Sequence, residues 1–160
     1  MDINYIGEWI WASHVGNFFV VLSFAAAILS FVSYAIGGSL NDDSWRNLGR
    51  KAFRLHTFSV IGIIAVLFII LMNHRYEFAY VSKHLNNAMP MRYILSCFWE
   101  GQEGSFLLWI FWNIVLGNIV IFGAGRWESR VMSVFGLVQL VLSSMILGVY
   151  FGDYQFGLNP

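Results

Sequence analysis

The stretch WEGQEGSFLLW covers residues 99–109, where a polar segment leads directly into a long apolar run. Glu100 and Glu103 precede the run, and carboxylates in this position favour the positive end of a following helix. Gly101 and Gly104 leave the backbone bare, which allows a ligand or a neighbouring helix to approach closely. The stretch therefore predicts a helix that begins near residue 105 and carries a polar motif at its outer end.

Working outward, three further apolar runs have a similar length. A bilayer core requires about 20 apolar helical residues, and the four runs cover residues 14–36, 55–72, 105–123 and 131–151. They are continuous rather than alternating, which favours helices over barrel strands. The composition is 58% hydrophobic and 11% charged, unlike that of an average soluble domain. We expect an all-α, polytopic membrane protein whose four transmembrane helices form a single region over residues 1–160.

Basic residues set the expected orientation of these helices. The two loops that join helices one to two and three to four hold six Lys and Arg, against three on the opposite side, so their side is expected to be cytoplasmic. The six are Arg46, Arg50, Lys51, Arg54, Arg126 and Arg130. Both ends of the chain and residues 73–104 are then expected outside. The formal net charge of zero gives no attraction to nucleic acid.

Two connecting segments have predicted structure of their own. Arg46, Arg50 and Arg54 are spaced by four residues and share one helical face, which predicts a short amphipathic helix on the lipid surface before residue 55. The outer segment 73–104 contains Pro90, which predicts a turn at residues 88–89. Residues 91–98 are expected to form a short interfacial helix that leads to Trp99.

The motif also resembles a known family. Residues 99–109 fit the pattern WxGxEGSxxLW, and FAYV at 78–81, NNAMP at 86–90, Tyr93 and GLNP at 157–160 accompany it. Together they resemble the CcmF/NrfE family, the haem-lyase subunits of cytochrome c maturation. Glu100 stands where members of that family often carry glycine. The family's tryptophan-rich WWD segment is absent, so the resemblance implies the N-terminal fragment of a longer chain.

The resemblance implies cytochrome c biogenesis. A family member accepts haem and attaches it covalently to apocytochrome c on the periplasmic side of the bacterial inner membrane. The implied partners are a haem chaperone, apocytochrome c and thiol-handling maturation subunits. The expected docking residues for haem or its carrier are Trp99, Gly101, Glu103, Gly104, Ser105 and Trp109. The fragment alone is expected to be inactive as a haem lyase.

The four histidines are candidate haem ligands because imidazole is a common axial ligand. His14 and His74 are expected on the outer side, where they could form a ligand pair or be interfacial polar residues. His56 is expected at the cytoplasmic edge as a lipid-headgroup contact. None of these matches the ligand motifs of the family, so the resemblance implies that the haem ligands lie outside this fragment.

Two other residue sets have simpler expected roles. Cys97 is the single cysteine, which excludes an intrachain disulfide and favours a packing role. Gly117, Gly136 and Gly148 are expected to allow close helix packing.

Two alternatives to haem delivery remain open. A helical transporter or channel module would use Glu100 and Glu103 to bind a cation at a broken helix. A non-catalytic membrane anchor of a respiratory complex would fit a histidine pair at matched depth, which the sequence lacks.

Overall fold

The computed structural model describes residues 9–84, 86, 89–147, 149–151 and 154–156. Four helices in this part of the chain are long and apolar enough to cross a membrane. They are α1 (Ile10–Leu40), α2 (Asp43–Met72), α5 (Gln102–Gly123) and α6 (Glu128–Leu147). The predicted polytopic, all-α transmembrane architecture is confirmed.

Short elements complete the fold. The helices α3 (Ala79–His84) and α4 (Met91–Cys97) lie between α2 and α5, and the 3₁₀ helix η1 (Gly125–Trp127) joins α5 to α6. The helix expected at 91–98 is confirmed as α4, and its position at a membrane interface stays a prediction. The turn expected at 88–89 includes Ala88, which lies outside the described residues.

The prediction of a separate surface helix before residue 55 is wrong, because α2 runs from Asp43 to Met72 without a break. The turn after α1 is confined to two residues. Asn41 takes a left-handed conformation with φ 53°, and the Asp42 side chain accepts a hydrogen bond from the Ser44 N–H at 2.7 Å. Arginine stems lie along apolar surface while their charged heads stay in water, so a basic segment can continue a membrane helix.

The last helix ends earlier than its predicted limit of 151. α6 stops at Leu147, and β1 (Val149–Phe151) pairs in antiparallel register with β2 (Tyr154–Phe156). Valine and aromatic residues favour strands, and both β1 and β2 contain them. Local strand propensity therefore explains why the helix ends before the apolar run does.

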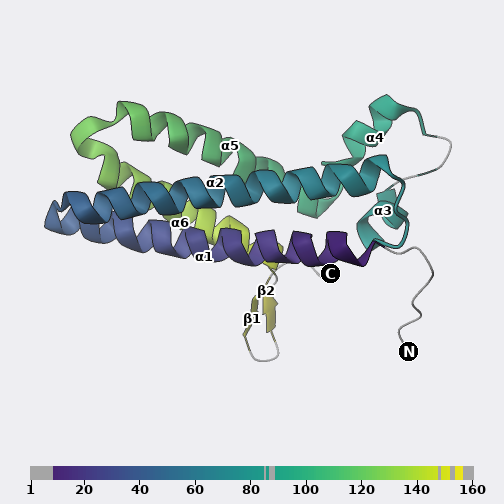
Figure 1. The fold of residues 1–160 in the computed structure, drawn as a ribbon, viewed down its shortest axis with the longest axis horizontal. Helices are drawn as coiled ribbons and strands as arrows, with labels where there is room; N and C mark the ends of the chain where they lie inside the picture. The colour runs from purple at the N-terminus through teal and green to yellow at the C-terminus, as the bar shows by residue number, and fades with distance from the viewer. Residues whose placement is uncertain (1–8, 85, 87–88, 148, 152–153, 157–160) are drawn as a thin grey trace.

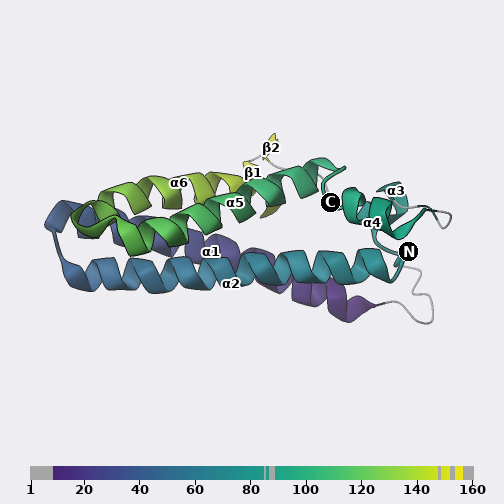
Figure 2. The ribbon, with the colours of Figure 1, turned by 90° about the horizontal axis from the view of Figure 1, so that it is seen from above.

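The helices form two antiparallel hairpins packed together (Figure 1). α1 contacts α2 and α6 most extensively, and α5 packs on α6 and α2. In both views the α1–α2 and α5–α6 corners lie at one end, while α3, α4 and the start of α1 lie at the other (Figures 1 and 2). The six basic residues named above are thus collected at one end of the bundle, hereafter the basic end.

Glycines in α5 and α6 permit the close contacts between the hairpins. A Cβ added to Gly117 would lie 2.4 Å from the Phe53 ring, and one added to Gly136 would lie 2.9 Å from Phe31 Cα. The predicted packing role is confirmed for both glycines, and Gly148 lies outside the described residues. Small residues of this kind let membrane helices approach each other.

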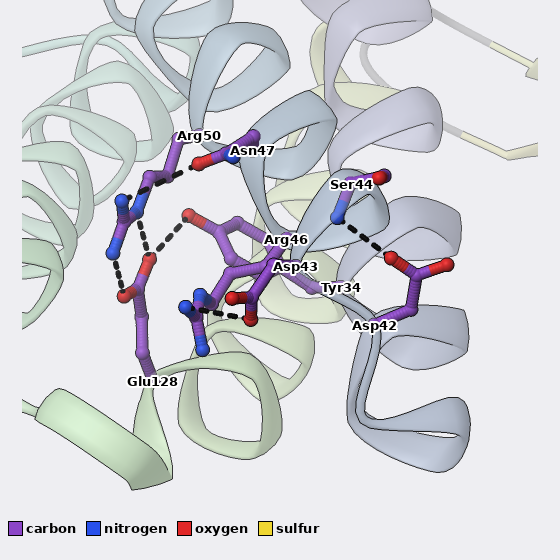
Figure 3. A network of polar contacts seen from close by, with 8 residues as sticks. All are labelled: Tyr34, Asp42, Asp43, Ser44, Arg46, Asn47, Arg50 and Glu128. Atoms are coloured by element: carbon purple, nitrogen blue, oxygen red, sulfur yellow. Dashed lines mark hydrogen bonds and ion pairs between the residues drawn. The ribbon is translucent and has the colours of Figure 1, made fainter.

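A buried carboxylate links three helices at the basic end (Figure 3). The Arg50 guanidinium of α2 donates from Nε to Glu128 Oε1 at 2.6 Å and from Nη2 to Oε2. The Tyr34 hydroxyl of α1 donates to the same carboxylate at 3.3 Å. Glu128 is 1% exposed, so this charge is paired and hydrogen-bonded as a buried charge must be.

The prediction that His56 contacts lipid headgroups is wrong, since its side chain is 0% exposed. α2 begins at residue 43 rather than 55, which places His56 about 20 Å along the helix. Its Nδ1 lies 2.8 Å from the Ser23 carbonyl oxygen of α1. Nearby in the bundle, Gln139 Nε2 donates to the Ile110 carbonyl at 3.1 Å and joins α6 to α5.

Candidate functional site

The junction between α4 and α5 carries the predicted motif and is held in place by α2 and α3. The Tyr80 hydroxyl of α3 lies 2.8 Å from the carbonyl oxygens of both Cys97 and Phe98, between which its hydrogen is shared. The Phe98 ring stacks on Phe68 of α2, with centroids 4.6 Å apart and planes 1° apart. These contacts fix where α5 begins.

Gly104 is required by the packing of this junction. A Cβ at this position would lie 1.7 Å from the Phe98 carbonyl oxygen and 2.8 Å from the Tyr80 hydroxyl. Such distances are far inside van der Waals contact, so no other residue fits without moving the junction. The bare backbone at Gly104 is therefore occupied by the chain itself.

Ser105 closes the turn that precedes α5. Its Oγ lies 3.2 Å from the carbonyl oxygens of Trp99 and Gly101, to which it donates. Gly101 is the N-cap residue of α5, with an extended backbone that any residue adopts. Glu103 lies in the first turn of α5.

An open groove runs along the start of α5, hereafter the motif groove. Its volume is about 410 Å³, and it is lined by Glu100, Gly101, Gln102, Ser105, Phe106 and Trp109. The rings of Phe106 and Trp109 meet edge to face at 5.4 Å. Trp109 is 59% exposed, so the groove presents an aromatic wall beside a carboxylate and bare backbone.

Five of the six predicted docking residues fall into three groups, and the side chain of Glu103 lies outside the described part of the structure. Gly101, Ser105 and Trp109 line the motif groove. Trp99 is exposed and lies just before it, with its ring edge-on to Phe98 at 5.9 Å. Gly104 packs behind the junction rather than in the groove.

The two outer histidines belong to the start of α1 and to the residues after α2, which lie at the same end of the bundle as α3 and α4 (Figure 1). His14 is exposed on α1, and His74 follows α2 with a left-handed φ of 49° and its ring 6.2 Å from that of Tyr76. No hydrogen bond or ring contact of the described residues joins the two imidazoles. Their pairing as haem ligands stays a prediction.

Two features were not predicted from the sequence, one in the motif groove and one at the basic end. Phe106 forms part of the groove wall, and its spacing of three from Trp109 is the signal that places both rings on one face. The pairing of Arg50 with Glu128 spans 78 positions, and no local spacing could have indicated it.

Comparison with known proteins shows which sequences and structures this chain resembles. No family model matches the chain. The cytochrome c-type biogenesis protein CcmF of Pseudomonas fluorescens is 27% identical over 139 residues, which cover 79% of this chain and 20% of that protein. CcmF of Haemophilus influenzae is 23% identical over 147 residues, covering 90% of this chain and 22% of its own length. The solved structure of the cytochrome c heme lyase CcmF superposes with a TM-score of 0.79 over 91% of this chain, at 19% identity. The chain is thus similar to one part of the CcmF protein.

The match to CcmF is partial in length. The chain spans about a fifth of the curated CcmF relatives and 25% of the solved CcmF chain. The cytochrome c-type biogenesis protein CycK of Bradyrhizobium diazoefficiens is also similar, with 25% identity over 105 residues. The resemblance to this family predicted from the motif is confirmed, and so is the multi-pass membrane fold.

The similarity to CcmF implies haem. The motif groove suits the planar face of haem but offers no ligand for its iron. The groove's exposed indole and half-buried phenyl ring suit the face of a planar macrocycle. No histidine, cysteine or methionine is among the residues that line it. Within the described ranges, no cluster of three His, Cys, Asp or Glu side chains could hold a metal ion. The groove can therefore contact a haem without ligating its iron.

Proposed function

We propose that this chain serves cytochrome c biogenesis as the part of a CcmF-type protein that forms the wall and docking surface for haem or its carrier. The similarity to the cytochrome c-type biogenesis proteins CcmF and CycK and the shared fold support this assignment. The observation that carries it is the motif groove, in which the exposed Trp109 and the half-buried Phe106 form an aromatic wall at the start of α5.

The chemistry of the groove suits contact rather than catalysis. Indole and phenyl faces stack on planar ligands, and Gly101 adds no side chain to the wall. Bound haem supplies the iron and the vinyl groups that are joined to apocytochrome c. This chain's residues hold its face and exclude water on one side, while the iron ligands come from other parts of the protein. The fragment alone is inactive in this proposal.

The position of the groove supports the proposed orientation. The start of α5, where the groove lies, is at the end of the bundle opposite the basic end (Figure 1). The positive-inside rule assigns the basic end to the cytoplasm. The groove then faces the periplasm across the bacterial inner membrane. A haem chaperone, apocytochrome c and thiol-handling subunits would meet the protein on this side.

Haem titration of the purified protein in detergent tests the proposal. Binding is followed by the shift of the Soret band and by quenching of tryptophan fluorescence. We expect saturable binding that Trp109→Ala weakens at least about fivefold, because loss of one stacking partner removes about 1 kcal/mol or more. Trp112→Ala is the matched control, since Trp112 is 56% exposed on the same helix but does not line the groove.

Two results would oppose the assignment. Absence of saturable binding in a protein shown to be folded would remove the groove as a haem surface. Equal losses in the Trp109 and Trp112 variants would indicate unspecific adsorption to exposed indoles. A loss of the Soret shift in His14→Ala would instead reveal an iron ligand in this chain.

A further inference from the structure

A polar pocket lies at the basic end, far from the motif groove. Its volume is about 690 Å³, and its walls come from the end of α1, the start of α2 and the corner between α5 and α6. The side chains that give it its chemistry are Ser39, Arg46, Arg126, Trp127, Ser129 and Arg130. Three arginines thus line one cavity, hereafter the arginine pocket.

The carboxylates at this end are already engaged. Asp42 accepts from the Ser44 N–H at 2.7 Å, and Asp43 pairs with Arg46 Nη2 at 2.8 Å. Glu128 is adjacent to Trp127 in the sequence, yet it is buried against Arg50 (Figure 3). These three are the acidic residues of the two basic-end connections, and each is bound to another group.

Arg126 and Arg130 consequently retain uncompensated charge. In the described part of the chain, no carboxylate lies within ion-pair distance of either guanidinium. Their Cζ atoms lie 5.7 and 5.5 Å from the centroid of the Trp127 ring, which orients both arginines around one indole. Arg46, which also lines the pocket, has its Nε buried without a hydrogen-bond partner among the described residues.

Gly37 and Gly38 keep the α1 wall of the pocket low. A Cβ on Gly37 would lie 3.1 Å from the Arg46 backbone nitrogen, and one on Gly38 would lie 3.6 Å from Arg130 Cγ. Without side chains at these positions, the last turn of α1 lies directly beside the arginines. The cavity between them is thereby kept open.

We propose that the arginine pocket binds the phosphate group of an anionic membrane lipid. The pocket lies where membrane-spanning helices end, which is the level of lipid headgroups. Guanidinium groups bind phosphate oxygens through paired, charge-assisted hydrogen bonds. Basic pockets between transmembrane helices recognise anionic headgroups by this chemistry. Trp127 is exposed and occupies the interfacial position that indoles favour.

Native mass spectrometry of the purified protein in detergent tests this site. Dioleoyl-phosphatidylglycerol is compared with dioleoyl-phosphatidylcholine, which has the same acyl chains and no net charge. We expect one preferentially retained phosphatidylglycerol. The double variant Arg126→Gln/Arg130→Gln is expected to weaken its binding about tenfold or more, because both charges face the pocket.

The matched control is Lys51→Gln/Arg54→Gln, which removes two exposed charges from the same end but none from the pocket. We expect a loss of less than about threefold, since exposed charges act only through the screened surface potential. Thermal unfolding of both variants tests whether the fold is kept.

Three outcomes would overturn the proposal. Equal retention of the two lipids would remove the requirement for an anion. Equal losses in the two double variants would indicate diffuse attraction to the basic end. Displacement of the lipid by inorganic phosphate at equal concentration would assign the pocket to free phosphate rather than to a lipid headgroup.

Discussion

Glu128 is the residue on which the basic end depends, because one carboxylate binds side chains from α1 and α2 (Figure 3). Glu128→Gln removes the charge and leaves the Arg50 guanidinium without its partner. Breaking a fully buried pair costs about 3–5 kcal/mol. The Arg50 side chain is 33% exposed, so solvent screening lowers the expected loss to about 2 kcal/mol. Thermal or denaturant unfolding in detergent measures this loss.

The Asp43–Arg46 pair supplies the control for that experiment. Asp43 is 75% exposed, so Asp43→Asn is expected to change stability by less than about 0.5 kcal/mol. A double-mutant cycle of Arg50→Gln with Glu128→Gln isolates the pair itself. A coupling near zero would show that the carboxylate acts through Tyr34 or not at all.

Cys97 is a buried thiol with a packing role, as the sequence predicted. Its Sγ lies 3.0 Å from the His84 carbonyl oxygen and 3.5 Å from Met89 Sδ. Burial, and next the Glu100 carboxylate, raise the pKa of this thiol above its ordinary value. Only the thiolate reacts with alkylating reagents, so the folded protein is expected to react slowly with iodoacetamide at neutral pH.

The pH dependence of Cys97 has a definite sign. The unfolded thiol loses its proton near its ordinary pKa of about 8.5, and the folded thiol does so at higher pH. Alkylation of the folded protein should therefore stay at least about tenfold slower than that of the SDS-unfolded protein at both pH 7 and about pH 9. The same difference lowers folding stability as the pH rises through this window. Equal rates in the two states at neutral pH would contradict the burial of Cys97.

At the scale of elements, the α4–α5 junction depends on one glycine. Gly104→Ala places a Cβ 1.7 Å from the Phe98 carbonyl oxygen. We expect a loss of about 1–3 kcal/mol, the usual cost of overpacking, together with weaker haem binding as the motif groove is displaced. Unfolding and haem titration of the same variant measure both effects.

Gly123 provides the matched substitution at the other end of α5. A Cβ there meets nothing within 4 Å, so Gly123→Ala is expected to be neutral or slightly stabilising. If Gly104→Ala behaved like Gly123→Ala, the junction would be more adaptable than its contacts indicate.

The elements also show what sequence reasoning could reach. Uninterrupted apolar runs predicted four membrane helices, because hydrophobic length is a property of each run alone. The helix ends were harder to predict from the sequence. The cap at Asp42 and the apolar stems of the arginines let α2 begin at Asp43, so His56 lies well inside the helix and is buried. The motif predicted Gly101, Ser105 and Trp109 in one place. The packing role of Gly104 depends on Tyr80 and Phe98, which no motif spacing could specify.

At the scale of the whole molecule, the two ends of the bundle are expected on opposite sides of the membrane. Ser39 is exposed at the basic end, and Ser82 is exposed on α3 at the other. In intact cells, a membrane-impermeant maleimide should label Ser82→Cys directly and Ser39→Cys only after lysis, because basic loops stay in the cytoplasm. The parent protein is the background control, since its own thiol is buried. The reverse labelling pattern would invert the proposed orientation and would place the motif groove in the cytoplasm.

The pairing of Arg50 with Glu128 also has a consequence for the order of synthesis. The two residues belong to different hairpins, and the chain is made from its N-terminus, so Arg50 enters the membrane boundary before its carboxylate exists. Helices insert first and associate afterwards. A nascent chain that stalls ahead of residue 128 therefore carries an arginine with no counter-charge, and arrival of the second hairpin neutralises it. The ion pair can thus form only when the second hairpin has joined the first and the bundle is complete.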